Sequence, residues 1–530
     1  MLFIAVICFA LLSFGQDPDA QGRRQPMQQP SPTPTAAAPT ASPTGSPATQ
    51  QRGPAERPSP SPEESPVVTK HEIRVGSRTL RYTATTGMML IKSRDGETEA
   101  RMFFMAYTLD DAGARGRRPL TFSFNGGPGS ASVWLHLGAI GPKRVPMNPD
   151  GTMPAPPYQL VDNEFTWLTQ TDLVFIDPVG TGYSRAVRPE LASKFFGLQG
   201  DIESVGEFIR LYLTRYERWT SPLFLAGESY GTTRASALSG YLIDRGIAFN
   251  GIMLISTIMN FETTNFAPGN DIPYVLFLPS YAATAWYHKK LSSDLQAKPV
   301  AEVATEAESW ASNEYTLALE KGDKLSGQER QDAISKLSRL TGLSPQFLDN
   351  ANLRVSLNLF RKELLRADKR SIGRLDARFK GYDTNLASDS PDYDPSEAAI
   401  RPPYTSTFNN YVRSDLGYKS DLEYYILGGG ITSPWNWGTN NNYVDTSVAL
   451  RNALARNPYL KVFVAMGYYD MATPYYAADY TLHHISLDPG LLRNISTGHY
   501  EAGHMMYIDE KSLGRLRADI GKFIQESMTR

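Results

Sequence analysis

A serine between two glycines is the first feature of this sequence that could do chemistry. The segment Gly227-Glu228-Ser229-Tyr230-Gly231 follows the apolar run LFLA and precedes GTTRASALSGYLIDRG, a stretch typical of a helix. A G-x-S-x-G segment between a strand and a helix is the pattern of a nucleophile elbow, which exposes the serine hydroxyl on a sharp turn. The N-terminus of the following helix favours developing negative charge. We therefore predict that Ser229 is a nucleophile; the alternative is an ordinary tight turn.

A serine nucleophile needs a histidine that takes its proton and a carboxylate that fixes the tautomer of that histidine. Asp470 follows the apolar run KVFVAMG, and His504 follows the next apolar run in the segment AGHMMY, before a stretch typical of a helix. The order serine, acid, histidine is that of an α/β-hydrolase triad. We predict Asp470 as the acid, the alternative being a cap or turn residue, and His504 as the base. His499, expected in the same loop, is the alternative base, and the pair at residues 483–484 lies in a helical stretch and is expected to be structural or at the surface.

Acyl transfer also needs two backbone N–H donors for the oxyanion that forms at the attacked carbonyl. The N–H of Tyr230, directly after the nucleophile, is one candidate. The second is Gly127, in the run NGGPGSAS that follows the apolar run LTFSF. Glycine there lets the main chain approach a substrate, whereas the alternative is a plain Gly/Pro turn. The run is not a phosphate loop, because no Gly-Lys-Ser/Thr follows.

The elements that must position these residues alternate between strands and helices. Short apolar runs, which are typical of strands buried on both faces, are PLTFSFNGG, TDLVFID, SPLFLAGES, GIMLIST, LKVFVAMG and LLRNIST. The stretch DIESVGEFIRLYLTRYERW places its apolar residues on one helical face. Alternating strands and helices predict an α/β fold with a mostly parallel central sheet. Before them, HEIRVGSRTLRYTATTGMMLIKS alternates apolar and polar residues as antiparallel strands do.

Composition divides the chain into five segments. Residues 1–15 are an apolar run that is typical of a secretory signal, too short to span a bilayer as a mature helix. Residues 16–66 are rich in Pro, Ser, Thr, Ala and Gln and predict a disordered linker. Residues 67–267 and 411–530 are expected to form the two parts of an α/β-hydrolase core. Residues 268–410 are helical and charged, and predict a cap inserted between them.

Bulk composition excludes several classes of function. With 53 basic and 55 acidic residues, the chain gives no reason to expect nucleic acid or an anionic membrane as partner. Its one cysteine, Cys8, lies in the predicted signal, so cysteine catalysis, thiolate metal sites and disulfides are excluded from the mature protein. We expect no metal and no cofactor, and no histidine has convincing metal-ligand spacing. Export without disulfides favours a periplasmic or extracellular bacterial protein with no membrane span in its mature form; the oligomeric state stays open.

Five segments resemble the serine carboxypeptidase family of α/β-hydrolases and occur in the same order as in that family, within residues 121–507. They are NGGPGSAS, IDPVGTGYS, GESYG, GYYDMATP and AGHMMY. The resemblance implies an exopeptidase that removes C-terminal residues from peptides through an acyl-enzyme on Ser229. It also implies that Asn125 and Glu228 bind the free terminal carboxylate of the peptide. Glu228 must be protonated to donate a hydrogen bond there, which gives an acidic pH preference. The alternative is that Glu228 braces the elbow.

The chain departs from the family pattern at several positions. Ala139 stands where the family has a second Glu of the carboxylate-binding pair, AGHMMY replaces Ala-Gly-His-Met-Val-Pro, and the family's cysteines are absent. An esterase, an acyltransferase or a peptide amidase with the same triad is therefore the alternative function, and an inactive binding protein is a third. Because Ala139 replaces that Glu, we expect the peptidase activity to depend less on acidic pH than it does in the family. A sharp optimum of activity at about pH 4 to 5 would contradict this expectation. Arg234 is expected to form a structural ion pair, with anion binding as the alternative.

Overall fold

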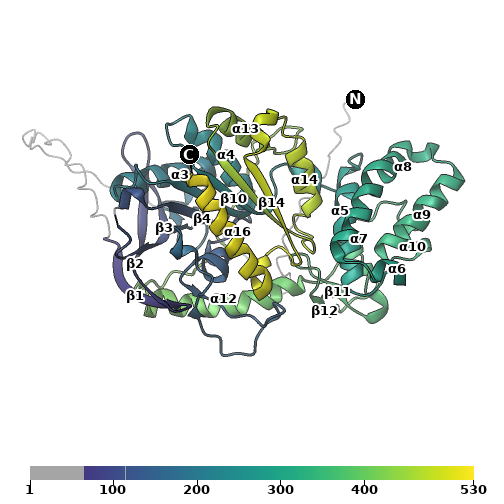
Figure 1. The fold of residues 1–530 in the computed structure, drawn as a ribbon, viewed down its shortest axis with the longest axis horizontal. Helices are drawn as coiled ribbons and strands as arrows, with labels where there is room; N and C mark the ends of the chain where they lie inside the picture. The colour runs from purple at the N-terminus through teal and green to yellow at the C-terminus, as the bar shows by residue number, and fades with distance from the viewer. Residues whose placement is uncertain (1–64, 114, 530) are drawn as a thin grey trace, which may run out of the picture. The chain divides into compact units, whose positions relative to one another are not determined.

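The computed structural model describes residues 65–113 and 115–529. The predicted signal and residues 16–64 of the predicted linker lie outside the described residues. The described chain is built on a ten-stranded sheet with helices on both faces (Figure 1). Within the described residues, none of the helices combines the length and the apolar composition needed to cross a membrane.

The central sheet begins with an antiparallel meander and continues as a parallel sheet. Its strand order is β1-β2-β3-β7-β4-β9-β10-β13-β14, with the short β8 paired to β3. Neighbours from β1 to β7 are antiparallel, and neighbours from β7 to β14 are parallel. The strands are β1 (Val67–Val75), β2 (Arg78–Lys92), β3 (Thr98–Leu109), β4 (Leu120–Phe124), β7 (Asp172–Ile176), β8 (Arg185–Ala186), β9 (Leu223–Ser229), β10 (Gly251–Thr257), β13 (Lys461–Gly467) and β14 (Ile495–Tyr500). Two short ladders pair β5 (Lys143–Arg144) with β6 (Val161–Asp162) and β11 (Ser371–Ile372) with β12 (Lys380–Gly381).

Strand β7 shows why the central strands read as continuous apolar runs. All of its residues are buried, but they point alternately to two different clusters. Leu173 and Phe175 pack in the first hydrophobic cluster, and Val174 and Ile176 pack in the second. Both faces of such a strand need apolar side chains, because helices cover both. The predicted α/β-hydrolase fold is confirmed.

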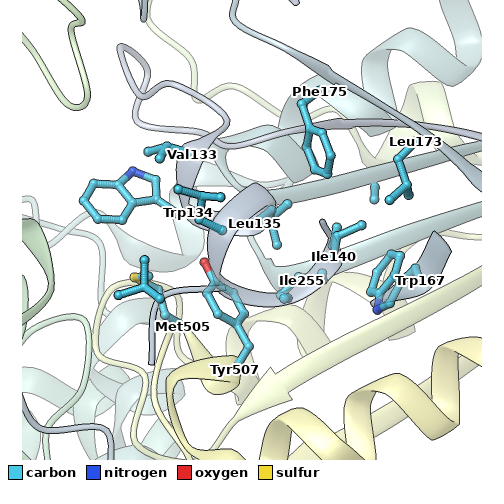
Figure 2. Close-up of a cluster of buried hydrophobic side chains, with 14 of the residues drawn as sticks. Val133, Trp134, Leu135, Ile140, Trp167, Leu173, Phe175, Ile255, Met505 and Tyr507 are labelled. Carbon is cyan, nitrogen blue, oxygen red and sulfur yellow. The ribbon is translucent and has the colours of Figure 1, made fainter. Parts of the chain in front are cut away.

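The helices form one layer on each face of the sheet. The first cluster, part of which is drawn in Figure 2, is covered by α1 (Val133–Leu135), α12 (Pro395–Ser414) and α16 (Glu510–Met528). The second cluster is covered by α2 (Pro189–Phe195), α3 (Leu198–Arg215), α4 (Tyr230–Ile243), α13 (Ser447–Arg456) and α14 (Tyr475–His483). A short helix, α15 (Pro489–Leu492), precedes β14.

The helical insertion forms a bundle with a hydrophobic cluster of its own (Figure 1). Its helices are α5 (Ile272–Tyr287), α6 (Ser293–Gln296), α7 (Val300–Trp310), α8 (Thr316–Lys321), α9 (Gly327–Thr341), α10 (Pro345–Asn350) and α11 (Leu357–Glu363). The prediction assigned residues up to 410 to this insertion, but α12 runs through that boundary. Tyr404, Phe408 and Tyr411 of α12 pack in the first cluster, beside the sheet. A helical pattern is the same in either location, so the sequence did not separate α12 from the bundle.

Candidate active site

Ser229 lies at the end of β9 in a strained backbone conformation. Its φ is 60° and its ψ is −131°, a region that costs a residue with a side chain about 1–3 kcal/mol. The two flanking glycines are required by close approaches of the backbone. A Cβ at Gly227 would lie 2.2 Å from the carbonyl oxygen of Gly231, and a Cβ at Gly231 would lie 2.9 Å from that of Phe124. The spacing G-x-S-x-G is therefore a steric requirement of this turn, as the sequence predicted.

The loop after β4 lies against the elbow. Strands β4 and β9 are neighbours, with Phe124 opposite Gly227. A Cβ at Gly126 would lie 2.4 Å from the amide nitrogen of Tyr230. The two segments that carry the predicted oxyanion donors, Gly127 and Tyr230, are thus brought together beside Ser229. Gly127 has a φ of 100°, a conformation that glycine adopts without strain.

Asp470 and His504 form a buried hydrogen-bonded pair. Asp470 Oδ2 lies 2.7 Å from His504 Nδ1, and both side chains are buried. Asp470 Oδ1 accepts hydrogen bonds from the backbone N–H groups of Ala472 and Thr473, at 2.8 and 2.9 Å. The Thr473 hydroxyl, which the sequence analysis did not single out, donates to Asp470 Oδ2 at 2.7 Å. Burial lowers the pKa of His504, but the charge and hydrogen bond of Asp470 outweigh it, so the pKa lies above its ordinary value.

The sheet places this pair next to the serine. The Ser256 hydroxyl, near the end of β10, donates to the His504 carbonyl oxygen at 2.5 Å. In the pairing of β10 with β9, Thr257 lies opposite Ser229. In the described residues the Ser229 hydroxyl makes no hydrogen bond to the His504 ring, and such catalytic hydrogen bonds often tighten only in the substrate complex. Ser229, Asp470 and His504 therefore lie at or just after the carboxyl ends of the parallel strands β9, β13 and β14.

The other downstream histidines lie elsewhere. His499 belongs to β14 and not to a loop as predicted; it stacks on Tyr468 and lies 3.3 Å from Asp479. The strand extends beyond the apolar residues that marked it, because its last positions pair with β13. His484 follows α14 and contacts the carbonyl oxygen of Tyr480 at 2.7 Å. Across residues 65–113 and 115–529, no three His, Cys, Asp or Glu side chains are grouped so that they could hold a metal ion.

Asn125 and Glu228 form a second buried pair beside Ser229. Asn125 Nδ2 donates to Glu228 Oε1 at 2.9 Å, and the Leu135 N–H donates to Asn125 Oδ1 at 3.0 Å. Burial raises the pKa of Glu228 to about 7, against the opposing effects of His504 and of nearby hydrogen-bond donors. Glu228 therefore keeps its proton in mildly acidic solution and can then act as a hydrogen-bond donor.

The predicted structural ion pair of Arg234 is confirmed. Arg234 Nε donates to Asp201 Oδ2 at 2.8 Å, and both side chains are buried. Arg234 Nη1 also donates to the Asn125 carbonyl oxygen at 2.7 Å, and the Tyr230 hydroxyl donates to Asp201 Oδ2 at 3.1 Å. This one pair thus connects the segment before Gly127 to the residue after the nucleophile.

A short segment beyond the helical bundle, residues 374–378, binds both loops that carry the acid and the base. The carbonyl oxygen of Leu375 accepts from His504 N at 2.6 Å, and that of Arg374 accepts from Met471 N at 3.1 Å. Asp376 Oδ2 accepts from Gly503 N at 3.2 Å and forms an ion pair with Arg378 at 2.7 Å. Nothing in the sequence indicated these contacts with the two loops, which join positions 97 to 129 residues apart.

We expect Asp376→Ala to lower the free energy of unfolding by about 3 kcal/mol, because it leaves Arg378 and an amide donor buried with fewer partners. The Asp376 and Arg378 side chains are only 3% and 9% exposed. Asp509, 3.3 Å from Arg378, remains as a second partner and limits the loss. Denaturant unfolding measures the change. The control is Lys522→Ala, whose partner Glu526 lies 3.8 Å away on the surface, with an expected change below about 1 kcal/mol. Equal changes in the two variants would contradict the prediction.

Comparisons with known proteins agree with this geometry. The model of the family described as serine carboxypeptidase matches residues 78–506. Pheromone-processing carboxypeptidase KEX1 of Saccharomyces cerevisiae is 33% identical over 158 residues, which are 27% of this chain and 20% of the yeast protein. Serine carboxypeptidase-like 36 of Arabidopsis thaliana is 27% identical over 172 residues, covering 31% of this chain and 33% of the plant protein.

The similarity in structure extends further along the chain than the similarity in sequence. The crystal structure of Kex1Δp, a prohormone-processing carboxypeptidase from Saccharomyces cerevisiae, matches with a TM-score of 0.53 and 17% identity. That match covers 84% of this chain and 91% of the yeast chain. The sequence alignments, in contrast, span a third or less of these curated relatives. Because the family match spans most of its residues, the chain belongs to the serine carboxypeptidase family.

Proposed function

We propose that the protein is a serine carboxypeptidase, which removes C-terminal residues from peptides with a free carboxylate. The observation that carries this proposal is the buried Asn125–Glu228 pair directly beside Ser229. An amide and a protonated carboxyl are neutral donors, so they can bind a carboxylate without repelling it.

In the proposed reaction, Ser229 Oγ attacks the scissile carbonyl carbon while His504 Nε2 takes the hydroxyl proton. The backbone N–H groups of Gly127 and Tyr230 stabilise the oxyanion of the tetrahedral intermediate. His504 then gives its proton to the leaving amine, and the acyl-enzyme remains on Ser229. A water molecule attacks the acyl carbon, with His504 again as base, and the shortened peptide leaves. Asp470 keeps the imidazole proton on Nδ1 and stabilises the imidazolium in both steps.

The pKa of Glu228 predicts how activity depends on pH. Above about pH 7 Glu228 loses its proton, so it no longer donates and instead repels the substrate carboxylate. We therefore expect the KM for a peptide with a free C-terminus to rise through that pH, and Glu228→Gln to remove the rise. At low pH the activity falls for a different reason, because His504 becomes protonated and cannot act as base. Steady-state kinetics from low pH to above pH 7 test both the loss of activity on the acid side and the rise in KM on the alkaline side.

The matched control for this experiment is the same peptide as a C-terminal methyl ester. It lacks the charge, so ionised Glu228 does not repel it and its KM should change little above pH 7. If the KM for the free acid still rises above pH 7 in Glu228→Gln, Glu228 is not the group that binds the terminal carboxylate. A sharp optimum at about pH 4 to 5 would contradict the assignment of Glu228 as well.

The proposed function itself is tested with N-blocked dipeptides that are either free or amidated at the C-terminus. We expect release of the last residue from the free acids and not from the amides, and no release by Ser229→Ala. Equal cleavage of the amides, or cleavage of esters alone, would favour the alternative of a peptide amidase, an esterase or an acyltransferase. The observation that favours this alternative is Ala139, which is buried and has no acidic group where the family has its second carboxylate-binding Glu.

We also propose that the protein is exported to the periplasm or the extracellular space of a bacterium. What supports this is the apolar N-terminal run, residues 1–15, which is typical of a secretory signal. N-terminal sequencing of the protein recovered outside the cytoplasm is the test, with Gln16 as the expected first residue.

A further inference from the structure

Two buried polar atoms beside the nucleophile lack a partner. Glu228 Oε2 and Tyr507 Oη make no hydrogen bond in the described residues. The residues that carry them are only 3% and 2% exposed. A buried polar group without a partner is destabilising, so such groups in a folded protein call for an explanation. A ligand that contacts both atoms would supply it.

Tyr507 belongs to the short turn after the catalytic histidine, Met506–Ile508. Its ring lies against the backbone of Gly138, where a Cβ would come within 2.4 Å of the ring and 2.7 Å of the Tyr404 hydroxyl. The missing side chain of Gly138 therefore makes room for the phenol. Figure 2 shows the Tyr507 hydroxyl oxygen directed toward α1, near the labelled Leu135. The amide of Leu135 is the group that holds Asn125 in place.

The surroundings of the Tyr507 hydroxyl are those of the proposed carboxylate site. Burial raises the pKa of Tyr507 well above its ordinary value, and the negative charge of Glu228 adds to the rise, while Asn125 opposes it. Conversely, the phenol is close enough to lower the pKa of Glu228. A phenol with such a pKa keeps its proton in neutral and mildly alkaline solution, where Glu228 loses its own.

The helical segment that precedes β5 offers no acid at this place. Ala139 is fully buried, and its carbonyl oxygen is already occupied by the Asn163 side-chain amide at 2.9 Å. Tyr507, in contrast, is a polar side chain that lies close to both Asn125 and Glu228.

We propose that Tyr507 is a substrate-binding residue whose phenol O–H donates a hydrogen bond to the terminal carboxylate of the peptide. The Asn125 amide and the protonated Glu228 carboxyl are the other two donors. This inference rests on the proposed carboxypeptidase function. It assigns a donor that does not titrate in the working range, next to one that does, and so predicts that recognition does not require strong acid.

The test is Tyr507→Phe, which removes one oxygen atom and keeps the ring on Gly138. We expect kcat/KM for a free N-blocked dipeptide to fall about ten- to a hundredfold, mainly through KM, as for loss of a hydrogen bond to a charged group. For the methyl ester of the same dipeptide, the kcat/KM of Tyr507→Phe should equal that of the wild type. Above pH 7 the loss for the free acid should grow, because Glu228 no longer donates there.

The matched control is Tyr82→Phe. Tyr82 is also fully buried, with a hydroxyl that makes no hydrogen bond within residues 65–113 and 115–529, but it lies on β2, separated from β9 by β3, β7 and β4. We expect this variant to match the wild type on both substrates. Thermal melting shows whether each variant is folded. Calorimetric binding of the free dipeptide to Ser229→Ala, with and without Tyr507→Phe, gives the same comparison without turnover.

The possible outcomes separate the two proposals. If the wild type does not distinguish free acids from amides, the proposed function fails. If the wild type does distinguish them and Tyr507→Phe leaves the KM and the Kd for the free acid unchanged, only the assignment of Tyr507 fails. An equal loss on the acid and the ester would show that Tyr507 merely supports the loop of His504, and would also overturn the assignment.

Discussion

Ser229→Ala lowers kcat by about a millionfold, because loss of the nucleophile leaves only substrate binding and the oxyanion donors. We expect this large effect without a matching loss of stability. The Ser229 side chain is only partly buried, and alanine has the same backbone strain at a φ of 60° as serine. The free energy of unfolding should therefore change by no more than about 0.5 kcal/mol. Release of the C-terminal residue measures the first quantity, and denaturant unfolding measures the second.

Covalent labelling by a fluorophosphonate gives an independent measure of the same serine. The wild type should be labelled at Ser229, and Ser229→Ala should not be labelled. Ser236→Ala is the matched control, because Ser236 lies further along α4 and is fully buried, with a hydroxyl that makes no hydrogen bond in the described residues. It should be labelled like the wild type. An unlabelled wild-type protein would point to the third possibility, an inactive binding protein.

The parts of the site that could be predicted from sequence are those with a local signature. The elbow follows from a strand, two glycines and a helix that are consecutive in the sequence. The steric reason for Gly227 lies within the turn itself, whereas Gly231 is required by the close approach of Phe124 on the neighbouring strand β4. Asp470 could be found for a similar reason, since a polar residue at the carboxyl end of a buried parallel strand lies at the edge where ligands bind. The strand order then brings these strand ends together, and an alternating pattern of strands and helices predicts that order in outline.

The parts that could not be predicted depend on contacts between distant segments. Residues 374–378 bind the loops of Met471 and His504 through backbone atoms, and a backbone contact leaves no mark on residue type. Tyr507 lies close to Glu228, and its ring fits there because Gly138 has no side chain. Thr473 had a weak local signal, because a threonine three residues after an aspartate can return a hydrogen bond to it.

Asp470→Asn is expected to lower kcat about 10,000-fold while leaving the fold intact. Oδ1 of residue 470 accepts from two backbone N–H groups, so an asparagine must place its oxygen there. Its amide N–H₂ then faces His504 Nδ1, which is now forced to accept a hydrogen bond. The ring proton moves to Nε2, the atom that should take the proton of Ser229. The variant therefore holds its base in the wrong tautomer, with each neighbour still in place.

The pH profile distinguishes this explanation from a general disturbance of the site. Burial lowers the pKa of His504, and Asp470 is the group that raises it above its ordinary value. Without that charge the pKa falls, so the acid limb of the residual kcat should move to lower pH. Thr473→Val is the matched control: it removes the 2.7 Å hydrogen bond to Asp470 Oδ2 but keeps the carboxylate. It should cost only about tenfold in kcat, the value of one hydrogen bond to a charged group, because the negative charge beside His504 stays in place. A loss in Asp470→Asn as small as that in Thr473→Val would mean that another carboxylate orients His504.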